Sequence, residues 1–160
     1  MPTILALDLA THTGWALGWE TARESGVQVF DVKRGESPGM RYVRFRRWLV
    51  DLVFSHLPEG MAELEDVALI VYEQAHQRGG AATEVAAGFT TRVQEFCAEH
   101  GLEHAAVHSG TLKKYATGKG NAKKPDMLAA ARTKLGYAGS DDNEADALWL
   151  LQYARTALVT

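Results

Sequence analysis

The sequence is poor in the features of secreted, membrane-bound and strongly basic proteins. Cys97 is its only cysteine, so no disulfide can form within the chain, and we expect a cytoplasmic protein. No apolar run reaches the roughly 18 residues that a membrane-spanning helix needs, and no secretory signal is visible at the start. The formal net charge of −3 argues, taken alone, against a nucleic-acid-binding protein.

The length and composition of the chain predict one folded domain. The chain has 160 residues, 46% of them hydrophobic, and contains no internal repeat, so we expect a single domain over residues 1–160. Apolar runs and helical spacing predict an α/β sheet with an antiparallel meander at one end. Thr83 and Ser109 are the expected caps of the second and third helices. The expected strands are Thr3–Leu9, Gly14–Trp19, Glu24–Asp31, Val67–Glu73 and Glu103–His108, and the expected helices are Met40–Leu57, Thr83–His100, Ser109–Tyr115, Lys123–Leu135 and one from Asp141 or Asp142 to about Ala157.

Three carboxylates lie at the margins of apolar elements. Asp8 is the one charge in the run Ile4–Leu9, Glu73 ends an apolar strand, and Asp146 lies among apolar residues of the last helix. A carboxylate in such surroundings costs several kcal/mol unless it is paired, protonated or bound to a cation. Hard divalent cations prefer oxygen ligands, and two of them can clamp a phosphodiester during its hydrolysis. The three acids therefore predict a metal site.

The start of the last helix supplies further polar residues. Asp142 lies four residues before Asp146 and Asn143 lies three before it, so either shares a helix face with Asp146. Asp141 and Glu144 fit an acidic variant of the capping box and are expected to begin the helix.

Positive charge gathers in one segment although the whole chain is acidic. Between Lys113 and Lys134 there is a single acid, Asp126. Clustered lysines neutralise phosphates, although a solvated helix face is the alternative. The segment Gly118-Lys119-Gly120 lacks the spacing of a nucleotide-binding loop, so we expect no nucleotide cofactor. A second basic cluster is either a solvated helix face or a contact with DNA arms: Arg41, Arg44, Arg46 and Arg47.

The order and spacing of these motifs resemble the RuvC-type Holliday-junction resolvases of the RNase H-like nuclease superfamily. The resemblance runs from Thr3 to about Ala154 and is carried by Asp8 with Thr13-Gly14-Trp15-Ala16, Glu73, the basic segment and Asn143–Leu148. It implies a mixed five-stranded sheet flanked by helices on both faces, a homodimer, and two Mg²⁺ or Mn²⁺ ions per active site. The implied activity is the resolution of four-way DNA junctions by paired symmetric nicks.

The resemblance also assigns roles to residues. Asp8, Glu73 and Asp146 match three acidic metal ligands. The fourth family position holds Asp or His and here is Asn143, so either Asn143 serves as ligand or Asp142 replaces it. His76 takes the place of a DNA-contacting aromatic residue and is either a DNA contact or an ordinary loop residue. The implied DNA-binding lysines are Lys113, Lys114, Lys119, Lys123 and Lys124.

Other interpretations stay open. An Asp-x-x-x-x-Thr-Gly opening is shared with ATP-binding kinases and chaperones, but those need two such lobes and this chain supplies one. The substrate could be a broader set of branched DNA or an RNA–DNA hybrid, and a degraded site would leave a non-catalytic junction-binding protein. Asn143 in place of the family residue favours a phage-borne enzyme. Phe89 and Phe96 share a helix face that belongs either to the core or to a dimer interface.

Overall fold

The computed structural model describes residues 2–19, 22–55, 67–75 and 79–159 and centres on a mixed five-stranded sheet. The strand order is β3-β2-β1-β4-β5. The first three strands form the expected antiparallel meander, and β4 and β5 extend it in parallel with β1. The strand bounds are β1 Thr3–Asp8, β2 His12–Trp19, β3 Ala22–Val29, β4 Val67–Glu73 and β5 Glu103–Val107.

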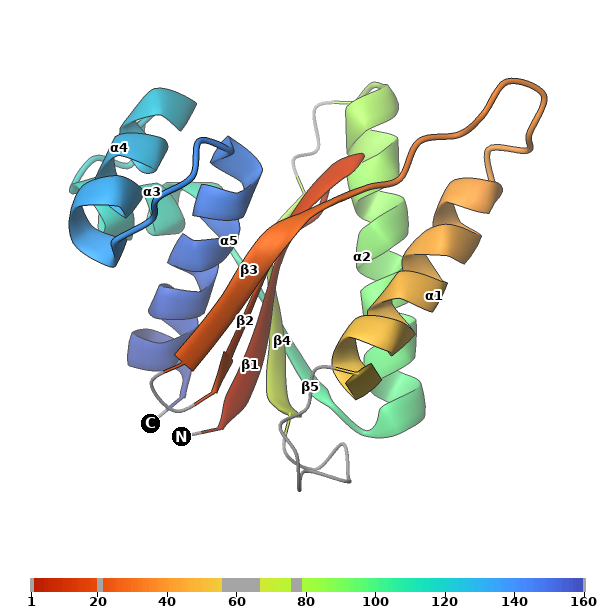
Figure 1. Ribbon diagram of the computed structural model, residues 1–160, viewed down its shortest axis with the longest axis horizontal. Coiled ribbons are helices and arrows are strands. Elements are labelled where there is room, and N and C mark those ends of the chain that lie inside the picture. The colour runs from red at the N-terminus through yellow and green to blue at the C-terminus, as the bar shows by residue number, and fades with distance from the viewer. Residues whose placement is uncertain (1, 20–21, 56–66, 76–78, 160) are drawn as a thin grey trace.

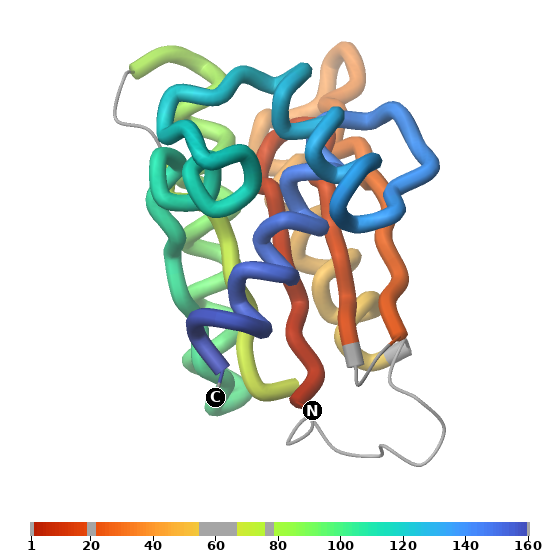
Figure 2. Tube along the Cα trace, turned by 90° about the vertical axis from the view of Figure 1, so that its left-hand side faces the viewer, coloured from red at the N-terminus to blue at the C-terminus, as the bar shows by residue number. Residues whose placement is uncertain are grey.

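Helices cover both faces of the sheet (Figure 1). α1 (Met40–Ser55) and α2 (Ala81–His100) lie on one face. α5 (Asp142–Tyr153) lies along the other face, and α3 (Ser109–Thr117) and α4 (Lys124–Leu135) pack beside it, towards the edge where β1 ends (Figures 1 and 2). A π-helical segment, η2 (Ala154–Leu158), follows α5. No helix in the described ranges is long and apolar enough to cross a membrane.

The two faces have separate apolar cores because alternate strand residues point to opposite sides. Ile4, Ala6 and Val71 pack against α3, α4 and α5. Leu5 and Leu7 pack with the helices of the other face, where Phe89 and Phe96 are fully buried. Phe89 stacks on Phe45 of α1 at a centroid distance of 4.3 Å. These two phenylalanines of α2 therefore belong to the core of this chain and are not exposed for a dimer interface.

Two expected helix caps are wrong. Gly80, with a positive φ of 91°, precedes α2, and the Thr83 hydroxyl instead donates to the Gly79 carbonyl oxygen within the helix start. His108 caps α3, where its Nδ1 accepts from the Gly110 N–H. α2 therefore begins without a side-chain cap, because Gly80 has no side chain that could accept a hydrogen bond, whereas at α3 the imidazole of His108 takes the role expected of Ser109.

The predicted capping box at the start of α5 (Asp142–Tyr153) is only partly formed. Asp141 Oδ1 accepts hydrogen bonds from the N–H groups of Asn143 and Glu144, so Asp141 is the N-cap. The reciprocal half of the capping box is absent, because the Asp141 N–H donates to the Tyr137 hydroxyl. Asp142 is consequently the first residue of α5, and its side chain is left for other partners.

The arginine cluster of α1 mostly makes contacts within the chain. Arg41 Nε donates to the Phe30 carbonyl oxygen, and Arg44 forms an ion pair with Glu36. Arg46 lies over the Phe96 ring and pairs with two glutamates of α2. Three of the four arginines thus fix α1 to its neighbours, and Arg47 is exposed.

Candidate functional site

Asp8 and Glu73 end two neighbouring parallel strands. The register pairs Leu7 of β1 with Tyr72 of β4, so Asp8 and Glu73 occupy the next position on both strands. Side chains alternate along a strand, and Ile4, Ala6 and Asp8 lie on one side, as do Leu69, Val71 and Glu73. The two carboxylates therefore emerge together on the face covered by α5, as strand pairing predicts.

Asp146 reaches the same place from α5 because the helix start lies directly on the sheet. Gly14 of β2 pairs with Asp8 across the antiparallel ladder. A Cβ on Gly14 would lie 2.0 Å from the Asn143 carbonyl oxygen, far inside van der Waals contact. Only glycine allows this approach. Thr13 adds a hydrogen bond from its hydroxyl to the Ala10 carbonyl oxygen (2.6 Å), which closes the turn after Asp8.

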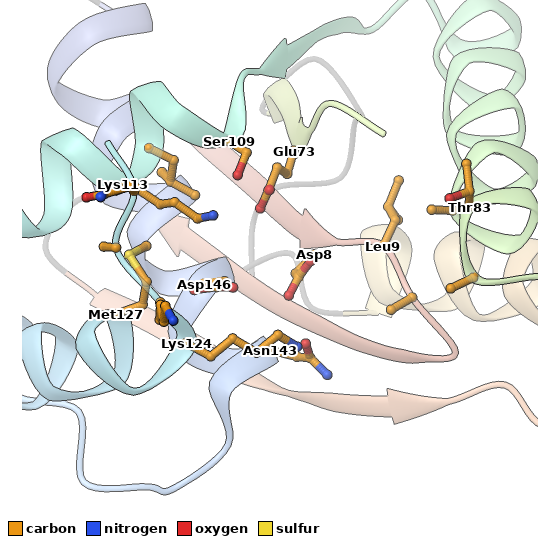
Figure 3. A pocket seen from close by; sticks show the side chains of 17 residues that line it. Asp8, Leu9, Glu73, Thr83, Ser109, Lys113, Lys124, Met127, Asn143 and Asp146 are labelled. Carbon is orange, nitrogen blue, oxygen red and sulfur yellow. The ribbon is translucent and has the colours of Figure 1, made fainter. Parts of the chain in front are cut away.

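The three carboxylates line one pocket of about 880 Å³ (Figure 3). Its walls come from the ends of β1 and β4, the start of α2, and from α3, α4 and α5. In Figure 3 the side chains of Asp8, Glu73 and Asp146 point towards a common space. Asn143 and three lysines also line the pocket: Lys113, Lys123 and Lys124. The pocket thus combines a carboxylate floor with a cationic margin.

Two of the carboxyl groups, Asp8 and Asp146, have raised pKa values. Burial, followed by the charges of Asp146 and Glu73, raises the pKa of Asp8 well above its usual range. Burial and the charge of Glu73 raise the pKa of Asp146 to about 7, while Lys124 and Lys113 oppose that rise. Since the acids interact, the protons belong to the group and not to one residue. A bound cation would relieve the same repulsion.

The donor set fits a hard divalent cation. Asp146 Oδ1 is buried and has no hydrogen-bond partner among the described residues, although buried polar atoms are normally paired. Carboxylate oxygens are the ligands that Mg²⁺ and Mn²⁺ prefer. As placed, no three acidic, histidine or cysteine side chains in the described ranges are close enough to form a finished site.

The two candidates for a fourth ligand lie in different places. Asn143 lines the pocket beside Asp8 (Figure 3). Asp142 does not line it, and its Oδ2 lies 3.2 Å from Lys124 Nζ in an ion pair. The structure therefore places Asn143, and not Asp142, in the wall of the pocket, although the charge of Asp142 still contributes to the raised pKa of Asp8 and of Asp146.

The lysines proposed to bind DNA are spread over the same region. Lys113, Lys123 and Lys124 line the main pocket, whereas Lys119 lines a smaller neighbouring pocket of about 280 Å³. Lys114 is exposed on α3 and lines neither. His76 lies outside the described residues.

Sequence patterns missed Ser109 and Asn121, which also line the main pocket. Ser109 is 6% exposed and lies two residues after the end of β5. Because β5 is parallel to β4, with Val107 opposite Glu73, residues after β5 must reach the same edge of the sheet. Strand order would have indicated Ser109. Asn121 lies in an irregular loop and gave no such signal.

Comparison with known proteins supports the fold alone. No protein-family model matches the sequence, and no curated protein matches it. A structure of RuvC from Thermus thermophilus is 19% identical, with a TM-score of 0.69, and the alignment covers 96% of each chain. T. thermophilus RuvC in complex with a Holliday junction substrate is 20% identical, with a TM-score of 0.72, covering 98% of this chain and 96% of that one. The chain therefore has the RuvC-like fold, an RNase H-like mixed sheet flanked by helices.

Proposed function

We propose that this protein is a metal-dependent, structure-selective endonuclease that resolves four-way DNA junctions by paired symmetric nicks. The observation that carries the proposal is the meeting of Asp8, Glu73 and Asp146 in one pocket bordered by lysines. The RuvC-like fold supports it, since one solved protein of that fold is bound to a Holliday junction substrate. Fold alone does not determine the substrate, so the site and the fold are needed together.

In this proposal Asp8, Glu73 and Asp146 hold two Mg²⁺ or Mn²⁺ ions, and Asn143 adds a neutral amide oxygen. Such ions supply Lewis-acid activation of water and neutralise charge on the leaving oxygen. The unpartnered Oδ1 of Asp146 is the structural support for this assignment. Without cations the carboxylate floor would repel a phosphodiester, so we expect no cleavage in a chelator.

The lysines would bind the DNA backbone. Lys113, Lys123 and Lys124 border the carboxylates and can hold the phosphates that flank the cut. Lys114 and Lys119 lie farther out and would bind neighbouring phosphates. Lysine–phosphate contacts release counterions, so junction binding should weaken steeply with salt. Selectivity would then come from the shape of the junction.

Paired symmetric nicks require two active sites. One chain contains one carboxylate pocket of this kind among its described residues, so we propose that two copies form a homodimer on the junction. A two-fold dimer presents two identical sites to the two equivalent strands.

The test is cleavage of a labelled four-way DNA junction, a linear duplex and an RNA–DNA hybrid in Mg²⁺, Mn²⁺ or EDTA. We compare the natural protein with Asp146→Asn and with Glu36→Gln, a matched acid-to-amide control at a surface ion pair outside the pocket. Metal-dependent paired nicks confined to the junction, lost in Asp146→Asn and kept in Glu36→Gln, are expected. Cleavage of the hybrid alone would overturn the substrate, and tight junction binding without cleavage would leave a non-catalytic binder.

A further inference from the structure

An ion pair joins the starts of two helices at the margin of the pocket. Lys124 is the first residue of α4 and Asp142 is the first residue of α5. Lys124 Nζ lies 3.2 Å from Asp142 Oδ2. Lys124 lines the pocket and Asp142 does not. The carboxylate therefore holds the ammonium from outside the pocket.

This ion pair is too exposed to solvent to contribute much to the folding stability of the protein. The Lys124 side chain is 71% exposed and that of Asp142 is 36% exposed. Surface ion pairs of this kind contribute at most about 1 kcal/mol. If the ion pair has a larger effect on the protein, that effect must come from the position in which it holds the Lys124 ammonium group.

The pocket itself competes for that ammonium. Asp142 accepts a hydrogen bond from Lys124, whereas Asp8 and Asp146 attract it at longer range. Lysine has a long and flexible side chain. If Asp142 released it, the field of the carboxylates would draw the ammonium towards Asp146, whose Oδ1 has no partner in the described part of the chain. There it would take the place of a divalent cation.

We propose that Asp142 is a positioning residue that tethers the Lys124 ammonium at the pocket margin. The tether leaves the carboxylates of Asp8 and Asp146 available to cations, and it leaves the ammonium available to a DNA phosphate. This inference rests on the proposed nuclease function and refines it. With the neutral Asn143 in the pocket, three carboxylates hold the ions, so competition from an untethered ammonium has a correspondingly larger effect.

A double-mutant cycle tests the tether by measuring Mn²⁺ affinity, by calorimetry or electron paramagnetic resonance, without DNA. The variants are Asp142→Asn, Lys124→Gln and the two combined, with Glu36→Gln as the matched control. Loss of a residue that orients a metal site typically weakens metal binding 10- to 100-fold. We expect about a tenfold loss in Asp142→Asn alone. Lys124→Gln should bind Mn²⁺ at least as tightly as the natural protein, because a competing positive charge is gone.

The combined variant separates an effect of Asp142 through Lys124 from a direct effect of Asp142 on the cation. If Asp142 acts through Lys124, the combined variant should match Lys124→Gln within about twofold, and Asp142→Glu should restore most of the affinity. An equal loss from Asp142→Asn in both backgrounds would show that Asp142 acts on the cation directly, as a ligand or through its charge, and would overturn the inference. An unchanged affinity in Asp142→Asn would overturn it as well. Absence of Mn²⁺ binding by the natural protein would overturn both this inference and the proposed function.

Discussion

Replacing Asp146 by Asn should stabilise the cation-free protein, and the gain should grow with pH. Burial and the charge of Glu73 raise the pKa of Asp146 to about 7 in the folded protein, from an ordinary value of 3.8. Between these two values the folded protein keeps a proton that the unfolded chain has released. Stability therefore falls as the pH rises through this window. Asn keeps the shape of the side chain and removes the titration.

The size of the effect follows from that difference. The two pKa values differ by about 3, and each pKa unit corresponds to about 1.4 kcal/mol. The upper limit for the gain is thus about 4 kcal/mol at pH 8, and the gain should vanish near pH 4. Coupling with Asp8, whose pKa is also raised, spreads the titration over both carboxyl groups and makes a smaller value expected.

Urea unfolding in EDTA at pH 4, 6 and 8 measures this gain. Glu36→Gln is the control, and its stability should change in the opposite direction. The hydrogen bond from Arg44 lowers the pKa of Glu36, so removing the carboxylate should destabilise the protein above pH 5. Adding Mn²⁺ should raise the unfolding midpoint of the natural protein at pH 8 and leave Asp146→Asn nearly unchanged. An Asp146→Asn variant no more stable than the natural protein at pH 8 in EDTA would refute this reasoning.

Two further predictions concern packing and reactivity. Gly14→Ala should lower the free energy of unfolding by about 1–3 kcal/mol or more and reduce junction cleavage, because the new Cβ would overlap the Asn143 carbonyl group. Gly39→Ala is the control, since a Cβ at Gly39 would make only an ordinary van der Waals contact. Equal losses of stability in the two variants would contradict the close approach of Gly14 to Asn143. Burial raises the pKa of Cys97 to about 11, so a thiol reagent at pH 8 should react only after unfolding. Rapid labelling of the native protein would contradict this.

The sequence was most informative where a charged residue interrupts an apolar pattern. Asp8, Glu73 and Asp146 could be chosen because each is charged at the margin of an apolar element. Five strands could be located within about two residues, since strand and helix periodicities are local properties of the chain. The lysine-rich segment was equally visible in the sequence, and the structure places three of its lysines in the wall of the pocket that holds the acids.

Helix geometry decided what the neighbouring residues do. Asp142 and Asn143 are adjacent in sequence, but successive helix residues are rotated by about 100°, so one faces Lys124 and the other lines the pocket. Spacing relative to Asp146 allowed both, because residues three and four apart both lie near the same face. Only the packing of α4 against the start of α5 separated them.

By itself the sequence determined the class of fold, the isolated carboxylates and the basic segment, because each depends on residues close together in the chain. Tertiary structure alone decided that Phe89 and Phe96 fill the core, that Asp142 pairs with Lys124, and that Ser109 joins the pocket. These outcomes depend on contacts between segments far apart in sequence, such as Gly14 against Asn143. Local periodicity in the sequence does not predict such contacts, because they depend on strand order, on strand register and on how one element packs against another.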